Sequence, residues 1–175
     1  MKSKIGFGGG CHWCTEAVFQ FIKGVSKVEQ GWISSVGDEE AYSEAVLLEV
    51  DTEQVSMESL VAIHLHTHSS TSNHPMRTKY RSAIYYFSES QKGQLEDILA
   101  QQQNDFEKKI ITRVLPFGQF EINKEKYRDY YQKNKTNSFC NSYIHPKLRT
   151  LLARFSKNVG ASLREELSDK KEKSL

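Results

Sequence analysis

The sequence predicts an α+β fold in which helices flank a central mixed β-sheet. Apolar residues recur at helical spacing in residues 13–22 and 89–108, which indicates two amphipathic helices. Residues 44–50 alternate in hydrophobicity instead, as one face of a strand does. The predicted strands at 25–34 and 44–50 have no helix between them, so a regular alternation of strand and helix is excluded.

The remaining elements follow from local patterns and from residues that begin or end helices. Strands are predicted at residues 4–7, 25–34, 44–50, 82–87 and 110–115, and helices at residues 13–22, 57–64, 89–108, 125–133 and 145–157. Gly24 ends the first helix, Ser56 caps the second, and Pro146 suits the first turn of the last. A polar turn is expected at residues 35–40 and a long loop at residues 66–79.

Length and charge restrict the class of protein. The chain has 175 residues, which is enough for one well-packed domain, predicted here as residues 1–157. Residues 158–175 are expected to be a charged C-terminal tail, frayed from residue 161 onward. The formal net charge is +2, from 24 basic and 22 acidic residues, so neither nucleic acid nor an anionic membrane is expected as a partner.

No segment of the sequence resembles a membrane span or a secretory signal. Apolar runs stay well below the ~20 residues that a transmembrane helix needs. The N-terminus is basic, but the apolar stretch that follows is too short for the core of a signal peptide. A cytoplasmic protein is therefore predicted, in which the three cysteines are catalytic, metal-binding or buried rather than a disulfide framework.

Three glycines, Gly8 to Gly10, lead from the first strand to a cysteine at the start of a helix. Glycine permits a sharp turn, and the free N–H groups and positive dipole of a helix start favour an anion there. Cys11 should therefore ionise readily and act as a nucleophile. The competing interpretation is a small buried residue in a tight turn; a phosphate-binding loop is disfavoured because no Lys-Ser/Thr pair follows.

Cys14 completes a C-x-x-C spacing with Cys11, which is typical of a redox pair or of half a metal site. Two cysteines could bind zinc together with two histidines of a nearby cluster, which consists of His64, His66, His68 and His74. Their spacing across a helix end and a loop does not place them on one face, so no metal is expected.

Four stretches resemble the peptide methionine sulfoxide reductase A family, and they occur in that family's order. Gly9 to Glu16 resembles its Gly-Cys-Phe-Trp signature, Tyr42 to Val46 its His-Ala-Glu-Ala-Val strand, Thr78 to Ile84 its Thr-Gln-Tyr-Arg-Ser-Ala-Ile segment, and Asp129 to Asn134 a helix near its C-terminus. The resemblance spans roughly residues 4–150. It implies a ferredoxin-like core and a peptide-methionine (S)-S-oxide reductase.

The resemblance also implies roles for single residues. Cys11 matches the nucleophile that attacks the sulfoxide sulfur, and Glu44 the carboxylic acid that protonates its oxygen. Tyr80 matches a tyrosine that holds this oxygen. Cys140 resembles the resolving cysteine, and Cys14 competes with it for that role. The implied substrate is methionine S-sulfoxide, free or in proteins, and the implied protein is a monomer without a cofactor that thioredoxin or another dithiol reduces.

The substrate pocket departs from the family pattern. Trp13 matches the indole that packs against the substrate's methyl group. His12 stands where the family usually has phenylalanine, and it is expected either to make the substrate's methyl pocket less apolar or to place a titratable group near the thiolate. The loop that normally brings a second substrate-binding tyrosine is largely missing, and Tyr42 is the predicted substitute. The segment before the Tyr80 motif lacks the family's aspartate and a glycine.

Two other classes of function remain open from the residues alone. One is a general thiol–disulfide oxidoreductase that uses Cys11 and Cys14, although the glycine run and Glu44 have no clear task in it. The other is a zinc-binding module without enzymatic activity.

Overall fold

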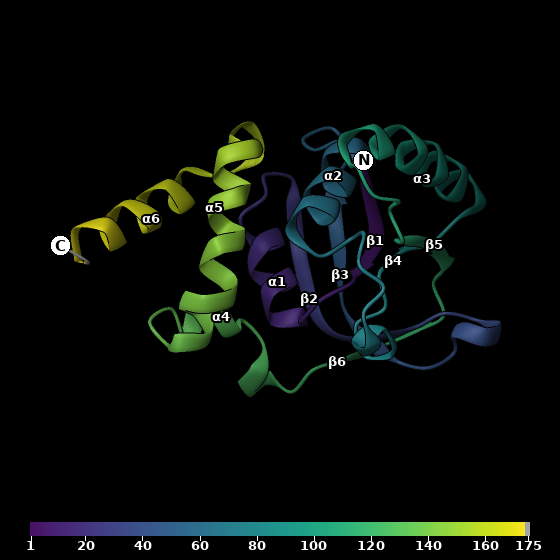
Figure 1. The fold of residues 1–175 in the computed structure, drawn as a ribbon, viewed down its shortest axis with the longest axis horizontal. Helices are drawn as coiled ribbons and strands as arrows, with labels where there is room; N and C mark the ends of the chain where they lie inside the picture. Colours follow the sequence, from purple (N-terminus) through teal and green to yellow (C-terminus); the bar gives the residue numbers. More distant parts are fainter. Residues whose placement is uncertain (174–175) are drawn as a thin grey trace.

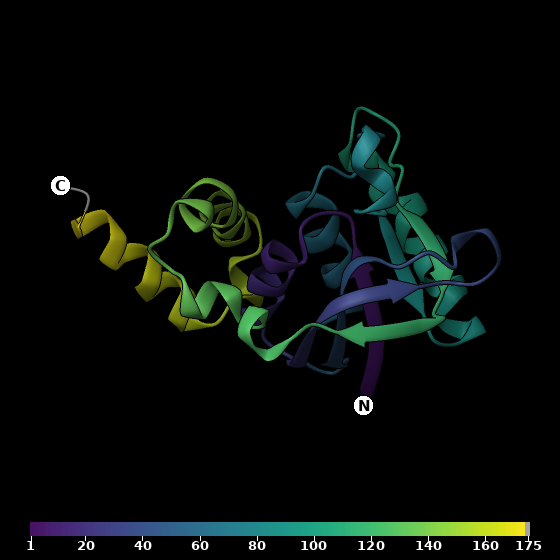
Figure 2. The same cartoon turned by 90° about the horizontal axis from the view of Figure 1, so that it is seen from below.

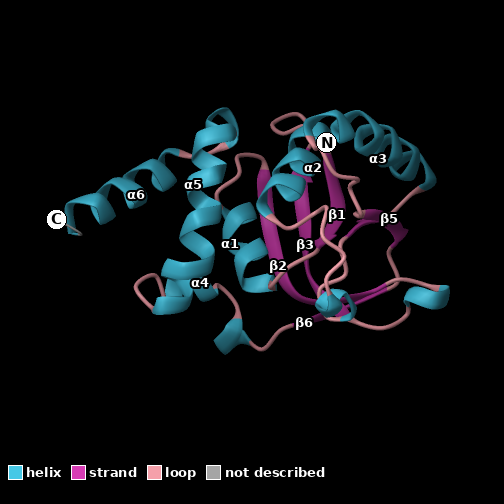
Figure 3. Ribbon diagram, viewed as in Figure 1, coloured by secondary structure: helices cyan, strands magenta, loops and turns pink. Residues whose placement is uncertain are grey.

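Six strands form one mixed sheet in the computed structural model, which describes residues 1–173 (Figures 1 and 3). The strands are β1 (Lys2–Gly8), β2 (Val25–Ser34), β3 (Ser43–Asp51), β4 (Ala83–Tyr86), β5 (Arg113–Pro116) and β6 (Gln119–Ile122). Their order in the sheet is β5-β4-β1-β3-β2-β6. Neighbouring strands pair antiparallel except for β4 and β5, which pair parallel.

Helices cover one face of this sheet and extend beyond its β2 side. They are α1 (His12–Gln20), α2 (Met57–Thr67), α3 (Glu89–Gln102), α4 (Tyr130–Lys133), α5 (His145–Arg154) and α6 (Ala161–Lys173). Helix α1 lies between the sheet and α5, and α6 points away from the sheet (Figures 1 and 2). Within residues 1–173, no helix combines the length and the apolar character that crossing a lipid bilayer requires.

Short helical turns complete the chain. Turns of 3₁₀ geometry lie at Gly37–Glu39, Pro75–Thr78, Gln103–Asp105, Glu125–Tyr127 and Ser156–Asn158, and a π-helical turn lies at Cys140–Ile144.

The predicted α+β fold with a mixed sheet is confirmed, and its centre is ferredoxin-like. The chain runs β1-α1-β2-β3-α2-β4, and these four strands stand in the order β4-β1-β3-β2. The predicted bounds of β2 agree with the structure. Strand β6 was not predicted, because its four residues are recognisable as a strand only through their pairing with the edge of β2.

The alternation predicted for β3 places its apolar side chains on the face that the helices cover. Val46, Leu48 and Val50 are fully buried there among residues of α1 and α2. Burial of each such side chain contributes about 1.5–3 kcal/mol. A smaller apolar cluster, which includes Ile33 and Tyr85, covers the opposite face. Glu44 begins the buried row of β3, so the fold carries a carboxyl group toward α1.

Three predictions about helices were wrong. Residues 125–133, predicted as one helix, form a 3₁₀ turn at Glu125–Tyr127 and helix α4 at Tyr130–Lys133, because Asp129 between them has a φ of +53°. Helix α3 ends at Gln102, whereas the pattern predicted a helix to residue 108. Residues 161–173 form helix α6 rather than a frayed tail, because Leu163 is fully buried against the core. Residues 174–175 of the predicted tail lie outside the described residues, and the domain boundary at residue 157 stays a prediction.

The glycine run makes the turn between β1 and α1 that the sequence predicted. Gly9 has a φ of +150°, and a Cβ atom there would stand 2.5 Å from the ring of His68. At Gly8, a Cβ would meet the backbone oxygens of Arg81 and Glu44 at 3.0 and 3.1 Å. At Gly10, apart from its chain neighbours, no atom of the described residues lies within 4 Å of such a Cβ. Two of the three glycines are therefore required by close approach, and Gly10 is not.

We expect Gly9→Ala to lower the free energy of unfolding by about 1–3 kcal/mol, because the residue would be strained and would collide with His68. Gly10→Ala is the matched control and should change it by less than about 1 kcal/mol. Urea denaturation followed by circular dichroism measures both variants. Equal effects of the two substitutions would contradict this account of the turn.

Candidate active site

Cys11 directly precedes helix α1, where the first turn surrounds it with hydrogen-bond donors. The backbone N–H groups of Cys14 and Thr15 bond to the Cys11 carbonyl at 3.1 and 3.2 Å, which starts the helix. The Cys11 sulfur accepts hydrogen bonds from the Cys14 thiol and from the backbone N–H of Trp13. The bond from Cys14 is the largest influence, and together these contacts outweigh burial and lower the pKa of Cys11 to about 7. The Cys11 thiolate is thus populated near neutral pH.

The other two cysteines are more deeply buried than Cys11. Cys14 is buried, and its pKa is raised because its thiol donates to Cys11 and because burial disfavours the charged form. Cys140 begins the π-helical turn, is 0% exposed, and is close enough for its charge to act on Cys14. All three cysteines are reduced in the structure. The charges of both Cys11 and Cys140 therefore act on Cys14.

A cavity of about 550 Å³ adjoins Cys11. Its walls also include Cys14, His68, Tyr80, Phe139 and Lys147. The structure therefore brings together Cys11 and Tyr80, which the sequence predicted as partners although they come from distant parts of the chain. His12, Trp13, Tyr42, Glu44 and Cys140 are not among the residues that line this cavity.

His12 and Glu44 form a buried ion pair next to Cys11. The Nε2 atom of His12 lies 3.0 Å from Oε1 of Glu44, and Nδ1 lies 2.8 Å from the Gly31 carbonyl oxygen. Burial lowers the pKa of His12, but the hydrogen bond and the charge of Glu44 outweigh burial, so the pKa of His12 is raised. The Glu44 charge also acts on Cys11. The sequence left two roles open for His12, part of the methyl pocket or a titratable group near the thiolate. Its ring faces a carboxylate and its charge acts on Cys11, while substrate binding by His12 stays a prediction.

Trp13 belongs to an aromatic cluster at the side of the site. Its indole stacks on Tyr130 with ring centroids 3.9 Å apart and planes 1° from parallel, and Phe139 meets it edge-on at 5.4 Å. One face of the indole is therefore covered by the protein. The family resemblance implies that Trp13 contacts the substrate's methyl group. This contact stays a prediction, and it concerns the part of the indole that Tyr130 does not cover.

Tyr42 lies just outside β3 and points toward β6. Its hydroxyl donates to the side-chain oxygen of Gln119 at 2.9 Å, and the residue is exposed. The structure does not bring Tyr42 to the cavity beside Cys11, so its role in substrate binding stays a prediction that this placement does not support.

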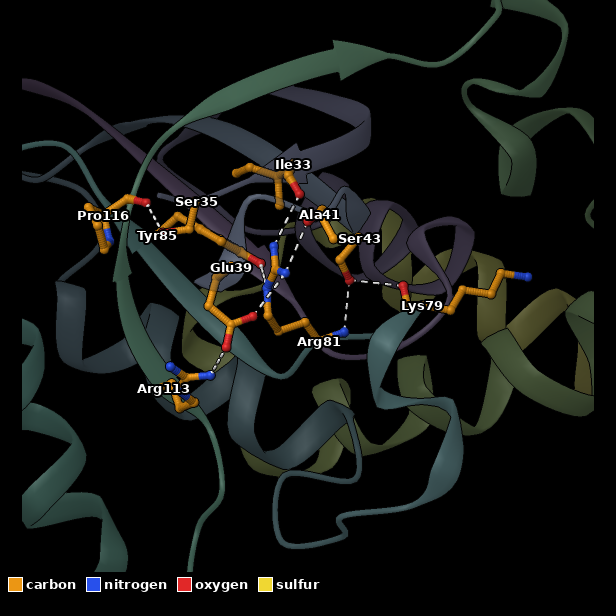
Figure 4. A network of polar contacts seen from close by, with 10 residues as sticks. All are labelled: Ile33, Ser35, Glu39, Ala41, Ser43, Lys79, Arg81, Tyr85, Arg113 and Pro116. Atoms are coloured by element: carbon orange, nitrogen blue, oxygen red, sulfur yellow. Dashed lines mark hydrogen bonds and ion pairs between the residues drawn. The ribbon is translucent and has the colours of Figure 1, made fainter. Parts of the chain in front are cut away.

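A polar network holds the segments that carry Glu44 and Tyr80 side by side (Figure 4). The Ser43 hydroxyl donates to the Lys79 carbonyl at 2.9 Å and accepts from the Arg81 N–H at 2.8 Å. The Glu44 N–H donates to the same carbonyl at 3.0 Å. The buried Arg81 guanidinium bonds in turn to carbonyls of the chain before β3 and to Glu39. Positions 44 and 80 are thereby fixed relative to each other.

The sequence did not identify the residues that hold the glycine turn. His64 Nε2 donates to the Gly8 carbonyl at 2.8 Å, and Arg77 donates to the Gly9 and Tyr80 carbonyls at 2.7 and 2.9 Å. His68 Nδ1 donates to the His64 carbonyl at 2.5 Å, and burial lowers the pKa of His68 to about 3. The only sign of them in the sequence was the histidine cluster, which suggested a zinc site instead. Within residues 1–173, no group of three potential ligand side chains is placed to hold a metal ion.

Lys147 is a further candidate for a functional residue, and the sequence did not identify it. It lines the cavity from α5, and its ammonium group donates to the Thr67 carbonyl. Its positive charge favours the thiolate form of Cys14. Lys147 is thus a basic group beside two cysteines in the cavity wall.

The sequence matches the family described as "Peptide methionine sulfoxide reductase" over residues 3–159. A relative from Acinetobacter baumannii (strain SDF), "Peptide methionine sulfoxide reductase MsrA", is 36% identical over 163 residues, which cover 85% of this chain and 93% of the relative.

Solved structures share the fold. Mxr1 from Saccharomyces cerevisiae in its reduced form superimposes with a TM-score of 0.70 at 20% identity, over 81% of this chain and 91% of Mxr1. Mxr1 in complex with Trx2 has a TM-score of 0.59 at 18% identity, over 71% of this chain and 83% of that one. With a family match over most of its length and a relative at 36% identity, this chain belongs to the peptide methionine sulfoxide reductase family.

Proposed function

We propose that this protein reduces methionine S-sulfoxide, free or within proteins, to methionine. The observation that carries the proposal is the ionisable Cys11 at the start of α1, hydrogen-bonded by Cys14 and open to a cavity that Tyr80 shares. Membership of the family supports the same reaction. A general thiol–disulfide oxidoreductase would not need a carboxyl group and a tyrosine held beside the nucleophile.

In the first step, the Cys11 thiolate attacks the sulfoxide sulfur. A bond forms between the two sulfurs while the sulfoxide oxygen receives a proton from Glu44. The hydroxyl group then moves to the Cys11 sulfur, the S–O bond and the bond between the sulfurs break, and Cys11 is left as a sulfenic acid while methionine leaves. The sulfoxide gains two electrons and Cys11 loses two. We propose that Tyr80, which lines the cavity, holds the oxygen through its hydroxyl group.

In the second step, the Cys14 thiol attacks the Cys11 sulfur and gives up its proton. A disulfide forms, the S–O bond of the sulfenic acid breaks, and the hydroxyl group leaves with that proton as water, after which an external dithiol reduces the disulfide. Cys14 is the proposed resolving residue because its thiol already contacts Cys11, whereas Cys140 is fully buried in the core. We propose that Cys140 then takes over the disulfide from Cys14; its electrostatic effect on Cys14 supports this order.

Thiols carry both electrons in this scheme, so the chemistry calls for no prosthetic group. The structure of Mxr1 in complex with Trx2 supports a thioredoxin as the dithiol that serves this chain. We further propose that the chain acts as a monomer in the cytoplasm; both statements stay predictions from the sequence.

Alkylation of Cys11 by iodoacetamide should accelerate with rising pH, with a midpoint near the pKa of about 7. The Cys14→Ala variant removes the hydrogen bond that contributes most to this lowering, so its midpoint should move to higher pH. Mass spectrometry of the labelled peptide measures the rate, and Cys11→Ser confirms the labelled position. An unchanged midpoint in Cys14→Ala would contradict the assigned hydrogen bond.

A single turnover separates the roles of the cysteines. Cys14→Ala should still form one equivalent of methionine from a methionine S-sulfoxide peptide, but its Cys11 sulfenic acid should persist and react with dimedone. Cys140→Ala is the control and should still form the Cys11–Cys14 disulfide. Disulfide formation between Cys11 and Cys140 at the wild-type rate in Cys14→Ala would refute Cys14 as the first resolving residue. Loss of methionine formation in that variant would favour simple thiol–disulfide exchange instead.

Replacement of the proposed acid should slow the first step selectively. We expect Glu44→Gln to slow formation of methionine in a single turnover by about 10²-fold or more, the typical contribution of a general acid. Glu49→Gln, also on β3, is the matched control and should retain the wild-type rate. A Glu44→Gln variant as fast as wild type would remove Glu44 from the mechanism.

A further inference from the structure

The bonding of His12 determines where its protons lie. A carbonyl oxygen can only accept a hydrogen bond, so the contact of Nδ1 with the Gly31 carbonyl places a proton on Nδ1. The contact of Nε2 with Oε1 of Glu44, at 3.0 Å, needs one further proton between these two atoms. If His12 is neutral, that proton belongs to Glu44 and occupies Oε1. If His12 is an imidazolium, Oε1 is purely an acceptor.

The second oxygen of Glu44 has no hydrogen-bond partner among the described residues 1–173. Oε2 is buried without a hydrogen bond, and Glu44 as a whole is 7% exposed. A buried carboxyl oxygen without a partner is costly, so its placement indicates a task in binding or catalysis. A proton on Oε2 would allow this atom to donate to an incoming oxygen acceptor.

We propose that His12, as an imidazolium, is a positioning residue that keeps Oε1 of Glu44 occupied, so that the proton which the carboxylate of this ion pair takes up for the sulfoxide oxygen lies on Oε2. This proposal rests on the function proposed above. When Oε2 gives its proton to the sulfoxide oxygen, Glu44 becomes a carboxylate beside the imidazolium. The positive charge stabilises this carboxylate, so Glu44 gives up the proton more readily. Water then returns one proton to Oε2 before the next turnover.

The surroundings of His12 are suited to a persistent charge. His12 is 3% exposed, and the charged groups that act on it are the Glu44 carboxylate of the resting pair and the Cys11 thiolate, which both favour the imidazolium. The thiolate continues to favour it while Oε2 carries a proton. Lys79, which is exposed, acts on Glu44 and Cys11 from outside. The ring edge also meets Trp32, with centroids 5.3 Å apart, which holds its orientation. Phenylalanine, the residue of the family signature, could provide none of this charge.

Two substitutions separate the hydrogen bond of His12 from its charge. His12→Phe removes both and should slow methionine formation in a single turnover by at least about tenfold. His12→Gln can still donate to Oε1 but has no charge, so its rate should lie between those of His12→Phe and wild type. His66→Gln is the matched control, because His66 lies away from the site, with Asp105 at 4.0 Å, and should keep the wild-type rate.

The pH dependence of the rate distinguishes a charged positioning role of His12 from a purely structural one. In the wild type, the rate of methionine formation should fall as pH rises through the pKa of His12, which lies above its ordinary value of 6.5. This limb should be absent from His12→Gln, which has no group to titrate there. A wild-type rate and profile in both His12 variants would overturn the proposal.

Nuclear magnetic resonance of the His12 ring nitrogens tests the pair without any turnover. The resonances should report an imidazolium near pH 7, and Glu44→Gln should lower the pKa of His12, because the carboxylate that raises it is removed. A neutral ring with an unprotonated Nε2 near pH 7 would overturn the proposal. If the wild-type protein formed no methionine while the ring titrated as expected, the proposed function would fail and the His12–Glu44 pair would stand.

Discussion

The turn from β1 into α1 is the constraint on which the rest of the site depends. It places the Cys11 sulfur in the first turn of a helix, where the Trp13 N–H and the Cys14 thiol donate to it. Such a turn needs glycine at positions 8 and 9, since side chains there would collide with backbone oxygens and with the His68 ring. Its carbonyl groups would be costly if buried without partners, and His64 and Arg77 donate to them. The histidines that could have formed a metal site thus serve as scaffolding for the nucleophile.

Around this turn, Cys11 has two kinds of neighbours. It lines the cavity together with Tyr80 and Lys147. His12 and Glu44 do not line this cavity and are buried next to the helix start. Their charges act on the Cys11 thiolate in opposite directions, since Glu44 disfavours it and His12 favours it. The ion pair therefore brings a carboxyl group close to a thiolate with less mutual repulsion than an isolated carboxylate would cause.

Membership of the family does not make this site a copy of its signature. The family has phenylalanine where His12 stands, and an aromatic hydrocarbon ring could not bond to Gly31 and Glu44 as the imidazole does. Trp13 is retained, but Tyr130 covers one face of its ring. In this chain, Trp13, Tyr130 and Phe139 form an aromatic cluster at the side of the site, while position 12 is polar.

Much of the fold and part of the site could be predicted from local patterns. The alternation in β3, the Ser56 cap of α2 and the glycine run before α1 are short-range signals, since neighbouring residues alone determine them. Strand β6 and helix α6 were missed because each is stabilised by distant contacts: β6 by pairing with β2, and α6 by burial of Leu163. Tyr42 was expected at the site because residues two apart on a strand share a face, which would place it beside Glu44. The strand begins only at Ser43, so the direction of the Tyr42 side chain does not follow this alternation.

The amino-acid sequence by itself determined that a cysteine would stand at a helix start with a second thiol three residues on. One helical turn is enough to bring those two sulfurs together. The sequence could not determine that His12 would face Glu44 or that Lys147 would face the cysteines. These contacts join separate elements, and the direction of each side chain follows from how α1 packs on β3 and α5. The tertiary structure decided them because burial obliges each polar group to find a partner across the core.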